Sequence, residues 1–443
     1  MTEGPIGRQL VLFMVPVLVT QLLQQLYLMA DAVVLGRFIG AAALAAQGTT
    51  ALLISVISNF FIGISAGISV LIGRLYGKED DAGLKSAINT SVTVSVLAGV
   101  IFTVLGTAGS ELMLTLLRTP DSVKELASDY LRICLIGMAP VLLYDVASST
   151  IRALGNSRTP LIILLASAVL NIVLDLVFIC GMSMGIRGAA AATVLSQFFA
   201  AVLTMIKLMR VDPAYCFDSI KIDPSYLREC LNKGLPAGFQ AVFMSISSLV
   251  LQTYINSFGQ DAMAGMNVFA KIEGFLYFPL FAFGIAVTTF ISQNAGAGKM
   301  ERVRQGALYS LKMAVIGSVV VIAVLLLLSR WIIWIFTDDA GVISNALEAI
   351  SFIFPCYWMY AINQVYIGVI RGVGNTGFPM ITSLCSYCVF RIAWCAALLP
   401  YFHTMRVIYT AYDASWVVMI ALLLFGMYRY VDKNAKFVLT DHL

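Results

Sequence analysis

Apolar residues fall into long runs along this chain, and short polar segments separate the runs. About 20 apolar residues in a helix are needed to cross the hydrocarbon core of a bilayer. The pattern therefore predicts twelve membrane-spanning helices, with the expected ranges 10–35, 43–72, 87–109, 127–150, 160–181, 187–208, 235–257, 263–292, 307–335, 346–369, 380–400 and 405–428. The stretch 209–234 is the only sizeable polar connection among them.

One sequence element occurs twice. Arg152-Ala-Leu-Gly155-Asn156, followed by Pro160, returns as Arg371-Gly-Val-Gly374-Asn375, followed by Pro379. At the same offset, three further small residues are repeated: Gly40, Ala45 and Gly77 fall on Gly259, Ala264 and Gly296. We infer a duplicated six-helix half. Because six crossings return the chain to its starting side, the repeat is parallel and its axis lies along the membrane normal.

We therefore expect an all-α integral membrane protein with twelve transmembrane helices in two parallel-repeat six-helix lobes around a central cleft. The predicted organisation is an N-terminal lobe over 1–208 (helices 1–6), a cytoplasmic linker over 209–234, and a C-terminal lobe over 235–443 (helices 7–12). Asp223 and Pro224 form a helix start, and an apolar stripe that includes Tyr226 and Cys230 follows. The linker should thus contain a short interfacial helix that leads into helix 7.

Composition supports this class. Of the 443 residues, 60% are hydrophobic and 12% are charged, and the mean hydropathy is +0.90, whereas a soluble domain is about 25% charged. The net charge of +4 is small and dispersed, so no nucleic-acid partner is expected. Two histidines make a histidine-built metal site or catalytic triad improbable. The eight cysteines form no framework and are read as packing residues.

The basic residues predict the orientation. Most of the 28 lysines and arginines fall in loops on the side of the two termini, so both termini should be cytoplasmic in a multi-pass protein of the cell (inner) membrane. The first apolar run has no small-residue cleavage site, and we expect it to remain as helix 1. Gly63 and Gly67 have the Gly-x-x-x-Gly spacing that favours close helix packing.

The repeated turns should lie at this cytoplasmic side. Glycine ends a helix, asparagine tolerates the turn, and proline begins the next helix. Arg152 and Arg371 would face lipid headgroups and helix carbonyl ends. We interpret these turns as structural, with a gating role for the two arginines as the alternative.

Polar residues inside the apolar runs are the candidates for function. Asn171 and Asp175 lie about one turn apart on one face of a helix, Thr193 lies in the next helix, and Asp31 lies near the end of the first. An ionisable group there costs roughly 2.5–3.5 kcal/mol. These four residues do not occur in the second half. Asp31 corresponds there to Leu251, Asn171 to Phe390, Asp175 to Trp394 and Thr193 to Tyr412, and Arg391 lies nearby in the sequence.

These four residues offer only oxygen ligands, which suits a hard cation such as Na⁺ and does not suit zinc or copper. Two nearby carboxylates also repel, so one of them can hold a proton. We therefore predict a cation-binding site of Asp31, Asn171, Asp175 and Thr193 for Na⁺ or H⁺, with no other metal and no cofactor. For each residue alone, the alternative is a hydrogen bond to a neighbouring helix.

Further polar residues are candidates for lining a substrate cleft: Gln24, Tyr27, Gln240, Glu273 and Asn363. For Glu273, an ion pair with Lys271 is an equal alternative. Asp145 lies two turns before Arg152 on one helix face, and we interpret it as structural.

The order and spacing of these elements resemble the multidrug and toxic compound extrusion (MATE) transporters, and most closely their DinF-like branch. The resemblance rests on Ala30-Asp31, the duplicated Arg-x-x-Gly-Asn-x-x-x-Pro, and Asn171-x-x-x-Asp175 followed by Gly188 to Thr193. It implies an antiporter with a V-shaped pair of lobes that exchanges Na⁺ or H⁺ for amphipathic, often cationic compounds. The ion site would lie in the amino-terminal lobe. Helices 10 and 11 lack the acidic residues of the family's other main branch.

We therefore predict a cation-coupled exporter, not an enzyme. Its partners would be small organic substrates and membrane lipids, and it would act as a monomer. The alternative within transport is a flippase of lipid-linked sugars in a related lobed fold, although such proteins usually have more helices and a strongly basic cleft. An intramembrane enzyme would need a nucleophile with a base, or a metal, and the chain has no HExxH motif. A receptor or scaffold would bind no ion.

Overall fold

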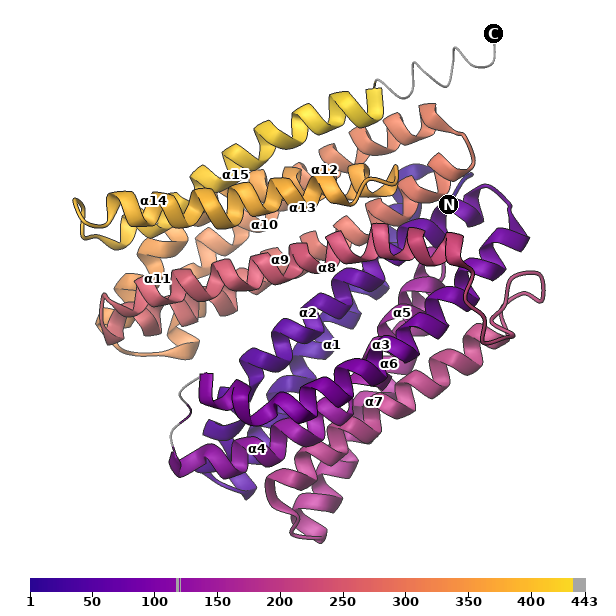
Figure 1. Ribbon diagram of the computed structural model, residues 1–443. Coiled ribbons are helices and arrows are strands. Elements are labelled where there is room, and N and C mark those ends of the chain that lie inside the picture. Colours follow the sequence, from indigo (N-terminus) through magenta and orange to yellow (C-terminus); the bar gives the residue numbers. More distant parts are fainter. Residues whose placement is uncertain (117–118, 120, 433–443) are drawn as a thin grey trace. The chain divides into compact units, whose positions relative to one another are not determined.

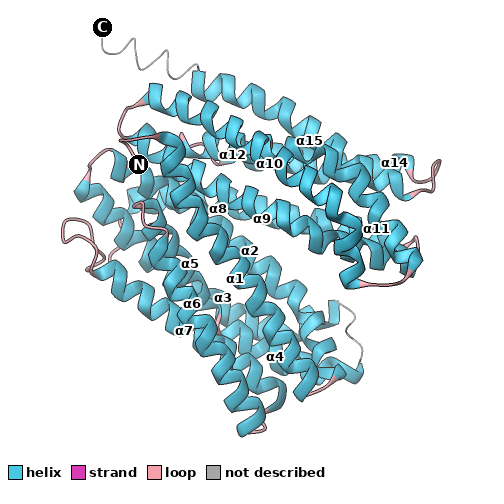
Figure 2. Ribbon diagram, turned by 180° about the vertical axis from the view of Figure 1, so that it is seen from behind, coloured by secondary structure: helices cyan, strands magenta, loops and turns pink. Residues whose placement is uncertain are grey.

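The computed structural model describes residues 1–116, 119 and 121–432, and these residues form helices and loops without any strand (Figures 1 and 2). The α-helices are α1 (Ile6–Phe38), α2 (Ala41–Gly77), α3 (Asp81–Leu116), α4 (Asp121–Ile136), α5 (Met138–Ala153), α6 (Arg158–Asp175), α7 (Gly185–Met209), α8 (Pro224–Asn256), α9 (Gln260–Gly296), α10 (Met300–Phe336), α11 (Ala340–Ile353), α12 (Tyr357–Gly372), α13 (Gly377–Ser383), α14 (Arg391–Leu398) and α15 (Met405–Met427). Short π-helical or 3₁₀ segments extend or join them: η1 (Leu176–Gly181), η2 (Phe354–Cys356), η3 (Leu384–Phe390) and η4 (Tyr428–Asp432).

The predicted all-helical membrane architecture is confirmed. Among the described residues, 11 helical segments are long and apolar enough to span a membrane, and α4 with α5 forms a bent pair that raises the total to 12. The expected C-terminal lobe continues to residue 443, and its last part, 433–443, lies outside the described residues. Arg118, Lys433 and Lys436, which count toward the predicted charge bias, also lie outside them.

Two predicted helices are interrupted. The expected helix 127–150 bends by 44° between α4 and α5, at Gly137. Pro140 explains the position, because a proline ring clashes with the carbonyl four residues earlier, here that of Ile136. The expected helix 346–369 likewise changes to the 3₁₀ turn η2, which contains Pro355. The apolar pattern therefore gives the length of these two crossings, and Pro140 and Pro355 lie at their breaks.

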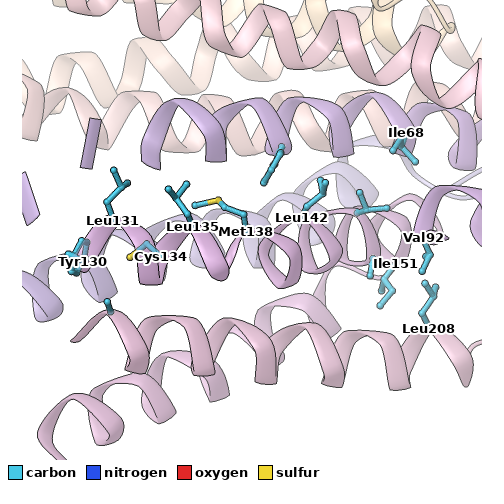
Figure 3. Packing of buried hydrophobic residues seen from close by; sticks show 14 of the residues in the cluster. Ile68, Val92, Tyr130, Leu131, Cys134, Leu135, Met138, Leu142, Ile151 and Leu208 are labelled. Carbon is cyan, nitrogen blue, oxygen red and sulfur yellow. The ribbon is translucent and has the colours of Figure 1, made fainter. Parts of the chain in front are cut away.

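The chain divides into two compact units. The first unit is Val15–Gly238, and the second unit is Met1–Met14 together with the chain from Phe239 onward. The core of the first unit is built from apolar side chains of α2, α3, α4, α5 and α7; Leu135 and Leu142 belong to it (Figure 3). Gly63 and Gly67 of α2 face the start of α8, where a Cβ would overlap the carbonyl oxygens of Ala237 and Lys233. The close packing predicted from their spacing is confirmed.

The segment before Gly238 differs from the expected short interfacial helix. Residues from Pro224 to Asn256 form one continuous helix, α8, with Pro236 inside it. Part of its apolar stripe faces protein, because Cys230 is buried in the core of the first unit and Tyr226 packs against that core, whereas Leu231 is 41% exposed. An apolar stripe on a helix predicts that lipid or protein covers it, and for Tyr226 and Cys230 the covering surface is protein.

The first residues of the chain group with the second unit and not with the lobe predicted over 1–208. Hydrogen bonds explain the grouping. Arg302 of α10 donates to the carbonyl of Gly4 at 2.7 Å, and Lys299 donates to the carbonyl of Thr2 at 3.2 Å. The side chain of Asn294, which is buried, donates to the carbonyl of Met1 at 3.3 Å.

The repeated turns have nearly identical geometry. Gly155 and Gly374 have φ values of 97° and 99°, which glycine adopts without strain. The amides of Asn156 and Asn375 each donate to a carbonyl five residues earlier, at 3.1 Å in both. The predicted role of these glycines in ending a helix is confirmed.

The arginines of the two turns are directed into their own units and not toward headgroups. Arg371 donates a hydrogen bond to the side-chain oxygen of Gln240. Arg152 is half-buried and interacts electrostatically with Asp145, one of the acids predicted to be structural. The gating role of either arginine stays a prediction.

Candidate functional site

Three helices of the first unit position the predicted cation-site residues. Asp31 comes from α1, Asn171 and Asp175 come from α6, and Thr193 comes from α7. Asp31, Asn171 and Asp175 are only 4%, 0% and 1% exposed. A hydrogen bond of 2.7 Å from the Ser167 hydroxyl of α6 to the Ser196 carbonyl of α7 helps to hold these two helices together.

The polar atoms of this site lack partners in the protein. One oxygen of Asp31, both oxygens of Asp175, both polar atoms of the Asn171 amide and the hydroxyl of Thr193 are buried without a hydrogen bond. Most buried polar groups in proteins are hydrogen-bonded, so a group of unpartnered atoms needs an explanation. A bound cation or proton would supply it.

The acids of the site lie close enough to influence each other. Asp175 interacts electrostatically with Asp31. The hydroxyl of Tyr27 interacts with both carboxylates and lies near Thr193. The structure therefore brings Asp31, Asp175 and Thr193 together, with Asn171 one helical turn from Asp175. Tyr27, predicted for the substrate cleft, lies at this site instead.

The sequence reasoning missed Gln47. This residue of α2 donates a hydrogen bond to Oδ2 of Asp31. Tyr130 and Cys134 of α4, both labelled in Figure 3, lie within electrostatic reach of the same carboxylate. The comparison of the two halves could have found Gln47, because its counterpart at the repeat offset is the apolar Met266.

The donor set of the predicted site consists of oxygen atoms. Two carboxylates, one amide oxygen and hydroxyl oxygens are hard ligands of the kind that alkali ions take. No group of three or more His, Cys, Asp or Glu residues that could hold a metal ion exists within the described part of the chain. The assignment of Na⁺ or H⁺ to these residues stays a prediction.

The other residues predicted for a substrate cleft lie in different surroundings. Gln24 is half-buried on α1. Gln240 is buried and donates to the Ser383 hydroxyl at 2.6 Å, and the buried Asn363 donates to the Trp416 carbonyl at 3.4 Å. Glu273 accepts a hydrogen bond of 2.9 Å from the Tyr357 hydroxyl.

The alternative ion pair between Lys271 and Glu273 is not formed. Lys271 is exposed, and its ammonium lies 5.2 Å from the ring centre of Phe336. Residues two apart on a helix point in different directions, so the two side chains reach different partners.

In the second unit a buried arginine directly follows Phe390, the counterpart of Asn171. Arg391, whose counterpart at the repeat offset is Ile172, is 8% exposed and donates through Nε and Nη2 to the Ser415 hydroxyl at 3.0 and 2.7 Å. Its guanidinium lies 5.1 and 4.5 Å from the ring centres of Tyr387 and Tyr412. The sequence comparison noted this arginine without assigning it a role.

A duplicated bundle of helices long and apolar enough to span a membrane defines a multi-pass membrane protein. The family model MatE matches residues 16–177 and 236–396 of the chain, so the chain belongs to the MatE family. The members of this family are transporters and not enzymes. The family resemblance seen in the sequence is confirmed, and the assignment to its DinF-like branch stays a prediction.

Named relatives cover nearly the whole chain. The probable multidrug resistance protein YoeA of Bacillus subtilis is 28% identical, over 98% of this chain and 96% of its own length. The probable multidrug resistance protein YpnP of the same organism is 30% identical over 89% of each chain. A relative from Shewanella oneidensis, 25% identical over 86% of each chain, is named as an FAD transporter.

A solved structure has the same fold. It is described as the outward-facing conformation of a multidrug resistance MATE family transporter, and it matches with a TM-score of 0.89 at 22% identity over 97% of each chain. At this identity the likeness establishes the fold.

Proposed function

We propose that this protein exports amphipathic, often cationic organic compounds from the cell and couples export to the entry of Na⁺ or H⁺. The observation that carries the proposal is the group of buried, unpartnered oxygens of Asp31, Asn171, Asp175 and Thr193. Burying a carboxylate without a partner is costly, so the site is suited to take up and release a small cation.

The coupling needs only a difference in affinity. A cation that binds one access state more tightly than the other shifts the population toward that state, and a substrate with the opposite preference shifts it back. Because α1 carries Asp31 and α6 carries Asp175, an ion shared by both residues would link the positions of these helices. Alternating access then follows from two ligands with opposite preferences.

The substrate class follows from the relatives. Several of them are named multidrug resistance or multidrug export proteins, which supports drug export over the flippase alternative. The protein would act as a monomer in the cell membrane, with both termini in the cytoplasm.

The test is dye efflux from proteoliposomes with an imposed Na⁺ or H⁺ gradient. We expect Asp31→Asn and Asp175→Asn to lose the gradient-dependent part of efflux, because an amide cannot carry the charge that the cation neutralises. Glu125→Gln is the matched control, since Glu125 is an exposed acid of the same unit. Normal gradient-dependent efflux in both site variants would remove this mechanism.

The choice between the two ions has its own measurement. Calorimetric titration of the purified protein with Na⁺ at two pH values separates them. Competition between the ions would weaken the apparent Na⁺ affinity at the lower pH, whereas a protein that uses H⁺ alone would show no heat of Na⁺ binding at either pH.

A further inference from the structure

A cavity opens where α5 and α7 of the first unit end. It has a volume of about 320 Å³ and is lined by Ile151, Leu154, Asn156, Lys207, Arg210 and the following segment up to Tyr215. Figure 3 shows Ile151 and Leu208 at the same end of the core of the first unit. The cavity lies outside the cation site, and the proposed transport function does not use it.

The last turn of α7 places this cavity at the boundary between hydrocarbon and water. Ile206 and Met209 are 39% and 52% exposed, as expected for side chains that face lipid. Lys207 and Arg210, which alternate with them, are exposed and line the cavity. Basic side chains at a helix end extend toward the headgroup layer while their stems cover apolar surface.

The cavity has an excess of positive charge. Neither Lys207 nor Arg210 forms an ion pair with a described residue. The one acid in the lining, Asp212, accepts a hydrogen bond of 2.9 Å from the Ala214 amide and so supports its own turn. The two cations are therefore available for an anionic group from outside the protein.

Part of the cavity's surroundings differs in the second unit. At the repeat offset Thr159 corresponds to Phe378, Lys207 to Gly426 and Val211 to Tyr430, whereas Arg210 corresponds to Arg429. The Phe378 ring lies 5.3 Å from that of Tyr430, and a Cβ on Gly426 would overlap Phe378. The second unit thus has two aromatic rings here and a glycine in place of Lys207. Because duplication copies structural features, a feature confined to one half is a candidate for function.

We propose that this cavity binds the phosphate headgroup of an anionic phospholipid. Lys207 and Arg210 contact the phosphate oxygens, Ile151, Leu154 and Tyr215 contact the glycerol region, and the acyl chains lie along the exposed apolar side chains of α7. Basic pockets between membrane helices recognise anionic lipid headgroups in this way. The cavity recognises the phosphate group, and we assign this group to a lipid of the surrounding membrane.

The test is lipid binding to the full-length purified protein in detergent, measured by native mass spectrometry with phosphatidylglycerol or phosphatidylcholine. Since each basic residue contributes about fivefold, we expect Lys207→Gln with Arg210→Gln to weaken phosphatidylglycerol binding roughly 30-fold. Binding of phosphatidylcholine should change little. The matched control, Lys221→Gln with Arg228→Gln, removes two exposed basic residues outside the cavity.

A second variant tests the cavity without removing charge. Leu154→Phe enlarges a side chain that lines the cavity, and it should also weaken phosphatidylglycerol binding. Thermal unfolding without added lipid shows whether each variant is folded. Unchanged phosphatidylglycerol binding in both folded cavity variants, or an equal loss in the control, would overturn the proposal. Displacement of the lipid by millimolar inorganic phosphate would overturn the choice of a membrane source.

Discussion

Gln47 donates a hydrogen bond to Oδ2 of Asp31, while Oδ1 of the same carboxylate is buried without a partner. One oxygen is thereby satisfied by the protein, and the other is left for a ligand. This division fixes the orientation of the carboxylate, since a hydrogen bond to one oxygen limits rotation of the group. Gln47 is thus a positioning residue for the proposed cation site.

Removal of this partner should affect both stability and ion dependence. Gln47→Met, which copies the counterpart in the second unit, leaves Oδ2 of Asp31 unsatisfied and should cost about 1–3 kcal/mol of stability. It should also reduce the extra thermal stability that Na⁺ or low pH confers, because the carboxylate is less well oriented. Thermal unfolding with and without the ion measures both effects.

Thr49→Ala is the control on the same helix, because the Thr49 hydroxyl bonds only the Ala45 carbonyl within α2. Equal ion-dependent stabilisation in Gln47→Met and the natural protein would show that Gln47 does not position the site.

Gly67 should be intolerant of any side chain. A Cβ there would overlap the carbonyl oxygen of Lys233 on α8, so Gly67→Ala must push the two helices apart and should cost about 1–3 kcal/mol. Gly48 is the matched control in the same helix, since a Cβ there meets nothing within 4 Å. Gly48→Ala should stabilise by about 0.5–1 kcal/mol, because glycine is unfavourable inside a helix. Urea or thermal unfolding of both variants would refute the argument if they shifted in the same direction.

The loop before α8 should be anchored in a pH-dependent way. Hydrogen bonds from Lys85, Asn89 and Ser219 lower the pKa of Asp218 to about 2, and the Lys85 ammonium lies 2.7 Å from its carboxylate. Because the pKa of Asp218 is lower in the folded state, this carboxylate stabilises the folded protein at pH values above its pKa in the unfolded chain, which is about 3.9. That stabilisation is lost as the pH falls from about 4 toward about 2.

The corresponding variant is Asp218→Asn. At neutral pH this variant should release the loop, and residues 212–223 should exchange their amide hydrogens faster than in the natural protein. The difference in exchange rate between the two proteins should shrink as the pH approaches about 2. Glu229→Gln, at an exposed acid of α8, is the control. A difference that stayed constant across this pH range would contradict the assignment.

Arg391 should be essential for the fold of the second unit. It donates two hydrogen bonds to Ser415 and interacts electrostatically with Glu273 and Asp413, so Arg391→Met should cost about 1–3 kcal/mol. Arg391→Lys should retain only part of the stability that Arg391 provides, because a lysine cannot reproduce the two hydrogen bonds to Ser415 or lie flat between the tyrosine rings.

A double-variant cycle separates charge from packing. Adding Glu273→Gln to Arg391→Met should restore stability, since one uncompensated acid is removed. If the two changes were simply additive, Arg391 would act through packing alone.

Several features of the protein could be predicted from its amino-acid sequence alone. The twelve crossings follow from the length of the apolar runs, because a bilayer requires a certain number of apolar residues whatever surrounds them. The repeated turns at Gly155 and Gly374 follow from local backbone chemistry. Asp31 and Asp175 stood out because acids are expensive in hydrocarbon, and no tertiary information is needed to see that.

Other features depend on which distant segments meet. The apolar stripe at Cys230 was assigned to the membrane interface, and the fold buries it in the first unit. Gln47, the donor to Asp31, and Ser415, the acceptor for Arg391, come from helices that are separate in the chain from their partners. Periodicity shows which face of a helix must be covered but not what covers it, and a polar side chain does not reveal its partner. Both are decided by the packing of whole helices, which sums many weak contacts spread along the chain.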